Sequence, residues 1–318
     1  MSSGDKKSVS GYQWPIAVCI ILISCIFLFT PEYLLAKEIS KFAIQWMFIC
    51  LGLGIVFMFM DLEKLLYTSF ICAGILAGFL LYSYNTSINH AFTTDEQSFR
   101  VSFVNPSLST SNHEETSENI SSTNADIIIL EEVTPEWDML IEKLRLKYKY
   151  SVILKRADLF GKAIFSNREL YNIDTLQVSN NLIILSKMKF SNNNELVLAV
   201  VNASPSRTMQ EFNKLEALLQ NLSQIINNLG TSIILGANLN VVPWDKSIRK
   251  FKLDTDLNSS RRYNNDGSME KDIWSLFNIP KNEIFYSKDI ECTKFQEIND
   301  KNSNPIGLIA RYQFIKLK

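Results

Sequence analysis

Three long apolar runs dominate the first quarter of the chain. They cover residues 14–33, 42–60 and 65–82, and charged residues gather in the short breaks between them. A helix of about 20 apolar residues is long enough to cross the hydrocarbon core of a bilayer. The pattern therefore predicts an N-terminal membrane region, residues 1–85, that contains three transmembrane helices.

A cleavable signal peptide is the alternative interpretation of the first run, because Lys6 and Lys7 precede it. No convincing small-residue cleavage site follows, and two further apolar runs come directly after it, so the sequence favours a retained anchor. The two lysines also favour a cytoplasmic N-terminus. Three spans then place the polar remainder outside the cytoplasm, in a multi-pass protein of the cytoplasmic (inner) membrane.

The polar remainder begins with a connector, residues 86–98, and continues with alternating strand-like and helix-like segments. Such alternation predicts an α/β (α+β) domain over residues 99–318. Its clearest helix is 209–229, where leucines and isoleucines form one apolar stripe and a glycine follows as the stop. Strands are expected at 100–104, 126–130, 152–154, 162–165, 182–190, 195–201 and 232–235.

One segment of this domain is strongly polar. Residues 107–123 are rich in Ser, Thr, Asn and Glu, so the sequence predicts a disordered insertion that cannot bury enough apolar surface to fold. Both histidines of the chain, His90 and His113, lie in polar sequence outside the expected strands. A mechanism that depends on a preorganised histidine is therefore not expected.

Charge and cysteine content exclude some classes of function. A formal net charge of −1 over 318 residues gives no chain-wide positive field, so nucleic acid is not an expected partner. The local basic group formed by Arg249, Lys250, Arg261 and Arg262 is expected to be a solvated face. Four of the five cysteines lie in the apolar runs, which excludes a disulfide framework in the remainder.

The stretch from Thr231 to Trp244, TSIILGANLNVVPW, is the most informative part of the sequence. It predicts a buried strand that runs into a loop, with Gly236 leaving room for a close approach and with Asn238 and Asn240 presenting amides at its end. Chemistry is expected at this strand end.

This stretch resembles the Gly-Asp-Leu-Asn strand end of the endonuclease/exonuclease/phosphatase superfamily, the DNase-like Mg-dependent phosphoesterases. Further segments resemble other motifs of the superfamily, in its order along the chain. They are 103–105 (FVN), 127–133 (IIILEEV), 161–166 (GKAIFS), 200–205 (VVNASP), 280–287 (PKNEIFYS) and 303–310 (SNPIGLIA). The resemblance implies a four-layer sandwich, in which two mixed β-sheets pack face to face, helices cover them, and the site lies where strand ends converge.

The resemblance also shows where this chain departs from the family. It places Asn238 at the Asp of Gly-Asp-Leu-Asn, Ser204 at a His, Asn282 at a second Asp, and Asn304 and Pro305 at the closing Asp-His pair. An amide cannot accept a proton at neutral pH, and proline offers no polar side-chain group. No residue is therefore identified as catalytic with confidence, and the family's reaction is expected to be lost.

Four residues remain as ligand-binding candidates: Asn105, Glu132, Asn238 and Asn240. Glu132 occupies the position of the family's metal-binding Glu and is a weak metal candidate. The alternative is structural, with the asparagines capping strand ends and Glu132 pairing with a cation. No cofactor is expected, and Mg²⁺ is expected only if activity is retained.

Three hypotheses of function follow. The first is a membrane-anchored, catalytically inactive phosphoesterase-like domain that binds a ligand or docks a protein partner. The second is a divalent-metal-dependent phosphodiester or phosphomonoester hydrolase, of nuclease or phosphatase type, with altered residues: Glu132 acts there with Glu131, Glu283 or Asp245. The third assigns the function to the three spans, as part of a membrane complex in which the soluble domain is a docking module.

Overall fold

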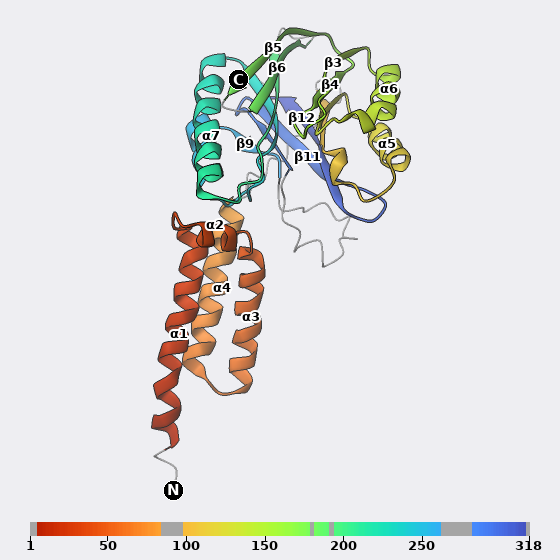
Figure 1. Ribbon diagram of the computed structural model, residues 1–318. Helices are drawn as coiled ribbons and strands as arrows, with labels where there is room; N and C mark the ends of the chain where they lie inside the picture. The colour runs from red at the N-terminus through yellow and green to blue at the C-terminus, as the bar shows by residue number, and fades with distance from the viewer. Residues whose placement is uncertain (1–4, 84–97, 179–180, 191–193, 262–281, 316–318) are drawn as a thin grey trace.

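The computed structural model describes residues 5–83, 98–178, 181–190, 194–261 and 282–315. It contains an N-terminal bundle of helices and a β-sandwich that sits on one end of the bundle (Figure 1). The predicted connector 86–98 and the turn at residues 192–193 lie almost entirely outside the described residues, as do Arg262 and His90.

The bundle consists of α1 (Asp5–Phe29), α2 (Leu34–Ser40), α3 (Ala43–Phe59) and α4 (Glu63–Ser83). Two of these helices, α1 and α4, are each long and apolar enough to cross a membrane. The pair α2 and α3 meets the same test as one bent segment, with an angle of 71° between its two parts. Two or three spans are therefore compatible with the predicted membrane region.

The helix of the first apolar run begins and ends earlier than the sequence predicts, because α1 covers Asp5–Phe29 and the expected span is residues 14–33. Its extension to residue 33 is wrong, because Thr30 adopts a φ of 41° and Pro31 follows it, and both end α1 at Phe29. The chain then forms the separate short helix α2 before it re-enters the bundle.

The sandwich consists of two six-stranded mixed sheets. This arrangement confirms the predicted fold class. The first sheet has the order β11-β12-β1-β2-β4-β3 and the second has the order β5-β6-β7-β8-β10-β9. The strands are β1 (Ser98–Val104), β2 (Ile127–Glu131), β3 (Tyr150–Leu154), β4 (Lys162–Ser166), β5 (Leu170–Val178), β6 (Asn181–Lys189), β7 (Glu195–Asn202), β8 (Ser232–Asn238), β9 (Asn258–Ser259), β10 (Asn282–Tyr286), β11 (Ile290–Asn299) and β12 (Pro305–Phe314).

Three apolar clusters hold the layers together. The central cluster lies between the two sheets, and it includes Phe103, Ile129 and Ile234. A second cluster packs α7 (Met209–Leu229) and α8 (Lys246–Thr255) on the outer face of the second sheet. A third packs α5 (His113–Ser122) and α6 (Asp138–Lys147) on the outer face of the first sheet, next to the short 3₁₀ turns η2 (Pro106–Leu108) and η3 (Pro135–Trp137).

Helix α7 has the bounds that the sequence predicts, and its ends explain why. Thr208 accepts from the backbone N–H of Glu211, while the Glu211 carboxylate accepts from the backbone N–H of Thr208, which completes a capping box. At the other end Gly230 adopts a φ of 61°, a left-handed conformation that favours glycine.

The prediction of disorder over residues 107–123 is wrong. Residues 113–122 form α5, which begins with an Asn112 side-chain cap on the backbone N–H of Glu115. Its Ile120 is fully buried in the third cluster. Before the helix, the Asp300 carboxylate accepts from the backbone N–H of Thr110 at 2.8 Å. Long-range contacts therefore order a segment whose own apolar content is too low for folding.

Candidate functional site

Three asparagines lie side by side at one end of the second sheet. The register pairs Asn202 of β7 with Asn238 of β8, and Asn238 with Asn282 of β10. Alternate residues of these strands, such as Val200 and Ile284, belong to the central cluster between the sheets. Because side chains alternate along a strand, the three amides point into the space between the sheets.

The first sheet places three further polar residues opposite these asparagines. Glu131 ends β2 and pairs directly with Lys162 at the start of β4. Asn105 follows β1, the neighbour of β2. Phe103 and Ile129, two positions before Asn105 and Glu131, lie in the central cluster, so the side chains of Asn105 and Glu131 also point between the sheets. Six residues thus converge where the strands end: Asn105, Glu131, Lys162, Asn202, Asn238 and Asn282. They are called the polar cluster below.

Backbone groups fix the orientation of the amides in the polar cluster. Asn202 Nδ2 donates to the Leu159 carbonyl at 2.7 Å, and Asn282 Nδ2 donates to the Ile306 carbonyl at 3.3 Å. Their side-chain oxygens are buried and have no hydrogen-bond partner. The amide nitrogen is therefore anchored in both residues, which leaves two fixed carbonyl acceptors in the cluster.

The other two amides have the opposite orientation. Asn105 Oδ1 accepts from the backbone N–H of Ser107 at 3.0 Å, and Asn238 Oδ1 accepts from the backbone N–H of Asn240 at 3.3 Å. The amides of both residues lie beside the Glu131 carboxyl group, but neither carboxyl oxygen has a partner within hydrogen-bond distance. The cluster therefore offers donors as well as acceptors.

Glu131 is fully buried, and burial raises its pKa well above the ordinary value. The neighbouring charge of Glu132 raises this pKa further, whereas Asn238, Asn105 and Lys162 lower it. The net direction is upward, so the neutral acid is favoured. A protonated Glu131 adds one O–H donor to the cluster.

Lys162 is also fully buried, and burial lowers its pKa to about 8. The charge of Glu131 opposes this shift. Its Nζ atom donates to the Phe160 carbonyl at 3.2 Å. A lysine on the same face as the acid therefore offsets the acid's negative charge and makes the net charge of the cluster less negative.

The remaining binding candidates lie at the margin of the polar cluster. Glu132 has a φ of 53°, is only partly buried, and follows the end of β2. Asn240 also has a positive φ, 53°, and its Nδ2 atom donates to the Ala203 carbonyl at 2.7 Å. The structure thus places Glu131, rather than Glu132, among the buried amides, and it gives Asn240 a bridging contact between two loops.

Three of the positions at which this chain departs from the family's motifs lie at the margin of the polar cluster. Ser204 is exposed, and Pro305 is the first residue of β12. The Asn304 amide nitrogen contacts the Asp300 carboxylate, at 3.2 and 3.3 Å, and the Thr110 hydroxyl at 2.7 Å. Burial alone raises the pKa of Asp300, but hydrogen bonds from the Thr110 and Asn304 N–H groups lower it to about 2.

The acidic residues that the hypothesis of a hydrolase with altered residues requires do not lie together. Asp245 caps α8 by accepting from the backbone N–H of Ser247. Glu283 is adjacent in sequence to Asn282, so it points to the opposite face of the sheet, where it contacts Ser259 and Arg261. Arg261 is 8% exposed and pairs with Glu297 at 2.5 Å, so the expectation that it belongs to a solvated face is wrong.

Mg²⁺ is the cofactor that the sequence resemblance implies, and the polar cluster fits it poorly. Magnesium binding draws on anionic oxygen ligands. The cluster supplies one carboxyl group, Glu131, whose neutral form is favoured, and it includes the cationic Lys162. Among the described residues, no group of three His, Cys, Asp or Glu side chains is placed to hold a metal ion.

Sequence reasoning overlooked two members of the cluster, Lys162 and Asn202, and did not count Glu131 among its main candidates. The signal for all three is strand alternation. Each lies two positions along its strand from a residue that faces the central cluster: Lys162 from Ile164, Asn202 from Val200 and Glu131 from Ile129. The superfamily resemblance directed attention to the motif residues instead.

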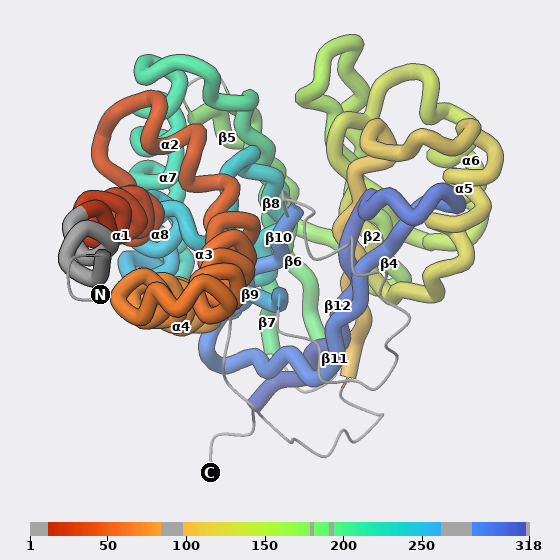
Figure 2. The backbone as a smooth tube through the Cα atoms, turned by 90° about the horizontal axis from the view of Figure 1, so that it is seen from below, coloured from red at the N-terminus to blue at the C-terminus, as the bar shows by residue number. Residues whose placement is uncertain are grey.

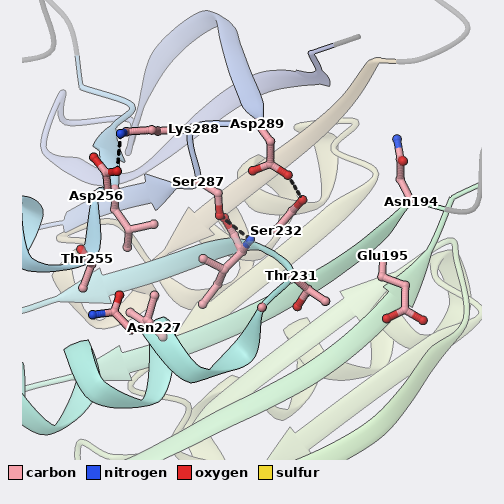
Figure 3. A pocket seen from close by; sticks show the side chains of 14 residues that line it. Asn194, Glu195, Asn227, Thr231, Ser232, Thr255, Asp256, Ser287, Lys288 and Asp289 are labelled. Atoms are coloured by element: carbon pink, nitrogen blue, oxygen red, sulfur yellow. Dashed lines mark hydrogen bonds and ion pairs between the residues drawn. The ribbon is translucent and has the colours of Figure 1, made fainter. Parts of the chain in front are cut away.

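A cavity lies at the opposite end of the second sheet (Figure 3). It has a volume of about 610 Å³ and opens where β8 begins and β10 ends. Its lining includes an ion pair between Lys288 and Asp256 and a hydrogen bond from Ser232 to Asp289. It is therefore separate from the polar cluster.

Comparisons with known proteins agree with this geometry. The profile described as "Endonuclease/Exonuclease/phosphatase family" matches residues 103–288. The catalytic domain of human Nocturnin with bound sulfate is 20% identical, with a TM-score of 0.54 over 69% of this chain and 94% of that one. An endonuclease/exonuclease/phosphatase from Beutenbergia cavernae is 11% identical, with a TM-score of 0.55 over 69% and 72%.

A third similar structure is ANGEL2, a 2',3'-cyclic phosphatase in complex with adenosine-2',3'-vanadate. It is 12% identical, with a TM-score of 0.53 over 72% of this chain and 99% of that one. No curated protein matches the chain. At these identities the solved structures show a shared fold.

Proposed function

Because the chain belongs to the endonuclease/exonuclease/phosphatase family, we propose that it is a membrane-anchored phosphoesterase-like domain that binds a ligand or a protein partner without hydrolysing a phosphoester. One observation carries this proposal. The strand ends that converge in the fold bring together four asparagines and a buried acid whose neutral form is favoured. Such a set stabilises a bound polar group but lacks the charge that holds a metal ion.

An altered hydrolase is the second candidate, and Lys162 favours it. A buried lysine with a pKa of about 8 has a suitable range for general base catalysis. Its Nζ atom lies in the polar cluster, on the face where a substrate bound between the sheets would lie.

Hydrolysis by the purified full-length protein decides between these candidates. Phosphodiester and phosphomonoester substrates, single-stranded DNA and phospholipids are assayed with Mg²⁺ or Mn²⁺, beside the variants Glu131→Gln and Lys162→Met. We expect the wild type and both variants to share the same background rate. A rate at least about 100-fold above that of either variant would support the hydrolase, because removing one acid or base costs about that much.

Anchoring in the membrane is supported by the apolar surface of the bundle. Leu22, Phe59 and Ile71 are more than half exposed, and lipid covers such side chains more favourably than water. We further propose that the N-terminus is cytoplasmic and that the sandwich lies outside the cytoplasm. Protease added to intact spheroplasts is then expected to cleave the sandwich. Cleavage that occurs only after the membrane is opened contradicts this topology.

A further inference from the structure

The sandwich is docked on one end of the bundle. Lys37 of α2 pairs with Glu216 of α7 at 3.1 Å. Trp244, in the loop that leaves β8, is buried in one apolar cluster with Leu80 of α4, and its Nε1 atom donates to the Ser40 carbonyl of α2 at 2.8 Å. These contacts, called the junction below, fix the orientation of the sandwich on the bundle, so they also fix which helix of the sandwich faces a membrane.

Helix α8 lies where the apolar spans end. The candidate spans end at Phe29 in α1 and at Ser83 in α4. Lys246 of α8 pairs with Glu32, just beyond the first of these ends, at 3.0 Å. Lys252 of α8 donates to the Ser83 carbonyl, at the second end, at 2.8 Å. Seen from below, α8 lies next to α1 and α4 (Figure 2), so with the spans in a bilayer it lies at the level of the lipid head groups.

Two exposed tyrosines mark the same level. Tyr33 is 74% exposed and Tyr82 is 76% exposed, and they lie beside the ends of α1 and α4 respectively. Tyrosine is enriched at membrane–water interfaces, where the ring contacts lipid and the hydroxyl group contacts water. The head-group layer is therefore expected to surround this end of the bundle and to reach α8.

Helix α8 carries positive charge that the junction does not neutralise. Four of its ten residues are cationic: Lys246, Arg249, Lys250 and Lys252. Lys246 is matched by Glu32, and Glu216 of α7 is already matched by Lys37. Within the described part of the chain, the other three cations of α8 form no ion pair with an acidic side chain. Their charge is therefore available to an anion.

Two of these cations repel each other. Burial lowers the pKa of Lys252, the charge of Glu283 raises this pKa, and the charge of Arg249 lowers it. Lys252 and Arg249 are thus close enough to interact, and the exposed Lys250 is adjacent in sequence to Arg249. An anion beside the three cations would relieve the repulsion, so the set favours a negatively charged ligand.

Arg249 has the geometry of a phosphate-binding residue. Its guanidinium group lies over the Phe79 ring of α4, 5.0 Å from the centroid. Phe79 is four residues before the end of α4, so the contact lies about 6 Å inside that end. The side chain is partly exposed, and no other described residue forms a hydrogen bond or an ion pair with the guanidinium. A stacked guanidinium keeps its N–H edge free, and this edge matches two oxygens of a phosphate.

We propose that Arg249 and Lys250, assisted by the charge of Lys252, bind the phosphate of an anionic phospholipid in the leaflet that the sandwich faces. A zwitterionic head group brings its own cation, so unmatched positive charge favours a lipid with a net negative charge. The inference replaces the solvated face that the sequence predicts for Arg249 and Lys250. It rests on the proposed membrane anchoring and is independent of whether the domain hydrolyses a phosphoester.

The test uses the purified full-length protein in detergent micelles. Phosphatidylglycerol and phosphatidylcholine with the same acyl chains are added in equal amounts, and native mass spectrometry measures how much of each lipid the protein retains. We expect phosphatidylglycerol to be retained about 25-fold more than phosphatidylcholine, because each basic side chain at an anionic surface contributes about 5-fold. Equal retention of the two lipids overturns the inference.

Charge variants locate the site. Arg249→Gln with Lys250→Gln is expected to abolish the preference, whereas Arg249→Lys with Lys250→Arg keeps the charge and is expected to lower it by less than about 3-fold. The control removes the same charge at Lys149 and Lys189, exposed residues beside β3 and β6, strands in the part of the sandwich away from the bundle (Figure 1). If this control lowers the preference equally, net charge explains it and the site is overturned.

Two single variants cover the case in which the double glutamine variant does not fold. Lys250→Gln changes one exposed side chain and is expected to lower the preference about 5-fold. Lys189→Gln, its matched control, is expected to leave the preference unchanged. Equal preferences in the two single variants overturn the role of Lys250.

The source of the phosphate is tested with glycerophosphoglycerol, the deacylated head group. We expect it to leave the lipid bound at equal concentration. Displacement would mean that the site takes a dissolved phosphate, and it would overturn the membrane source.

Extraction of cell membranes with alkaline carbonate separates this inference from the proposals on which it rests. Release of the protein overturns the anchoring and the lipid site together. A protein that stays in the membrane and retains both lipids equally overturns only the lipid site. Phosphoester turnover in the assay described above overturns only the proposed absence of hydrolysis.

Discussion

Replacing Trp244 with alanine is expected to lower the free energy of unfolding by about 3–5 kcal/mol, the usual effect of truncating a buried tryptophan. The side chain is 1% exposed and packs between the site loop and the helices of the bundle. Its Nε1–H group donates to the Ser40 carbonyl, so truncation also leaves a buried acceptor without its partner. Chemical unfolding of the full-length protein in detergent measures the change.

Two further variants separate packing from hydrogen bonding at this position. Trp244→Phe keeps most of the apolar contact and is expected to cost less than Trp244→Ala, with about 1 kcal/mol of the loss due to the hydrogen bond. Leu253→Ala, in the same region but 78% exposed, is expected to change stability by less than about 0.5 kcal/mol. If Trp244→Ala behaves like Leu253→Ala, the junction does not stabilise the fold.

Replacing Lys162 with methionine is expected to stabilise the protein by about 1–3 kcal/mol at pH 7. The folded pKa of about 8 lies below the ordinary 10.5 of lysine, and this shift corresponds to about 3 kcal/mol spent on burying the charged form. Between these two values the unfolded chain binds more protons than the folded one. Stability of the wild type is therefore expected to rise from pH 8 to pH 10, and the variant is expected to lack this rise.

Thermal unfolding across pH 8–10 measures this slope. Lys189→Met, at an exposed position, is the control and is expected to keep the wild-type slope. Glu131 acts in the opposite direction, because a raised carboxyl pKa contributes stability that is lost as pH rises through the folded value. A slope that survives in Lys162→Met contradicts the assignment of this titration to Lys162.

Much of the fold could be predicted from local pattern. Helix α7 has a complete apolar stripe and strong caps, and its bounds agree with the sequence residue for residue. Helix α5 could not be predicted in this way. It has few apolar side chains, and the segment that leads into it is held by Asp300, which lies 190 positions after its partner Thr110.

The site was harder to predict than the fold. The motif resemblance identified Asn105, Asn238 and Asn282, because strand ends keep their places in the family. It favoured Glu132 over Glu131, since a shift of one position along a strand exchanges the two faces of a sheet. Glu131 is the last residue of β2 and continues the inward-facing series of Ile129, whereas Glu132 follows the strand with a positive φ.

The anchored amides limit which side chains their positions tolerate. Asn282 and Asn304 stand where relatives are expected to carry aspartate, and in both the amide nitrogen already has an acceptor: the Ile306 carbonyl for Asn282 and the Asp300 carboxylate for Asn304. An aspartate at either position would set oxygen against oxygen. A single substitution by aspartate at either position meets this repulsion, so this chain is expected to tolerate the family's aspartates there only with a loss of stability.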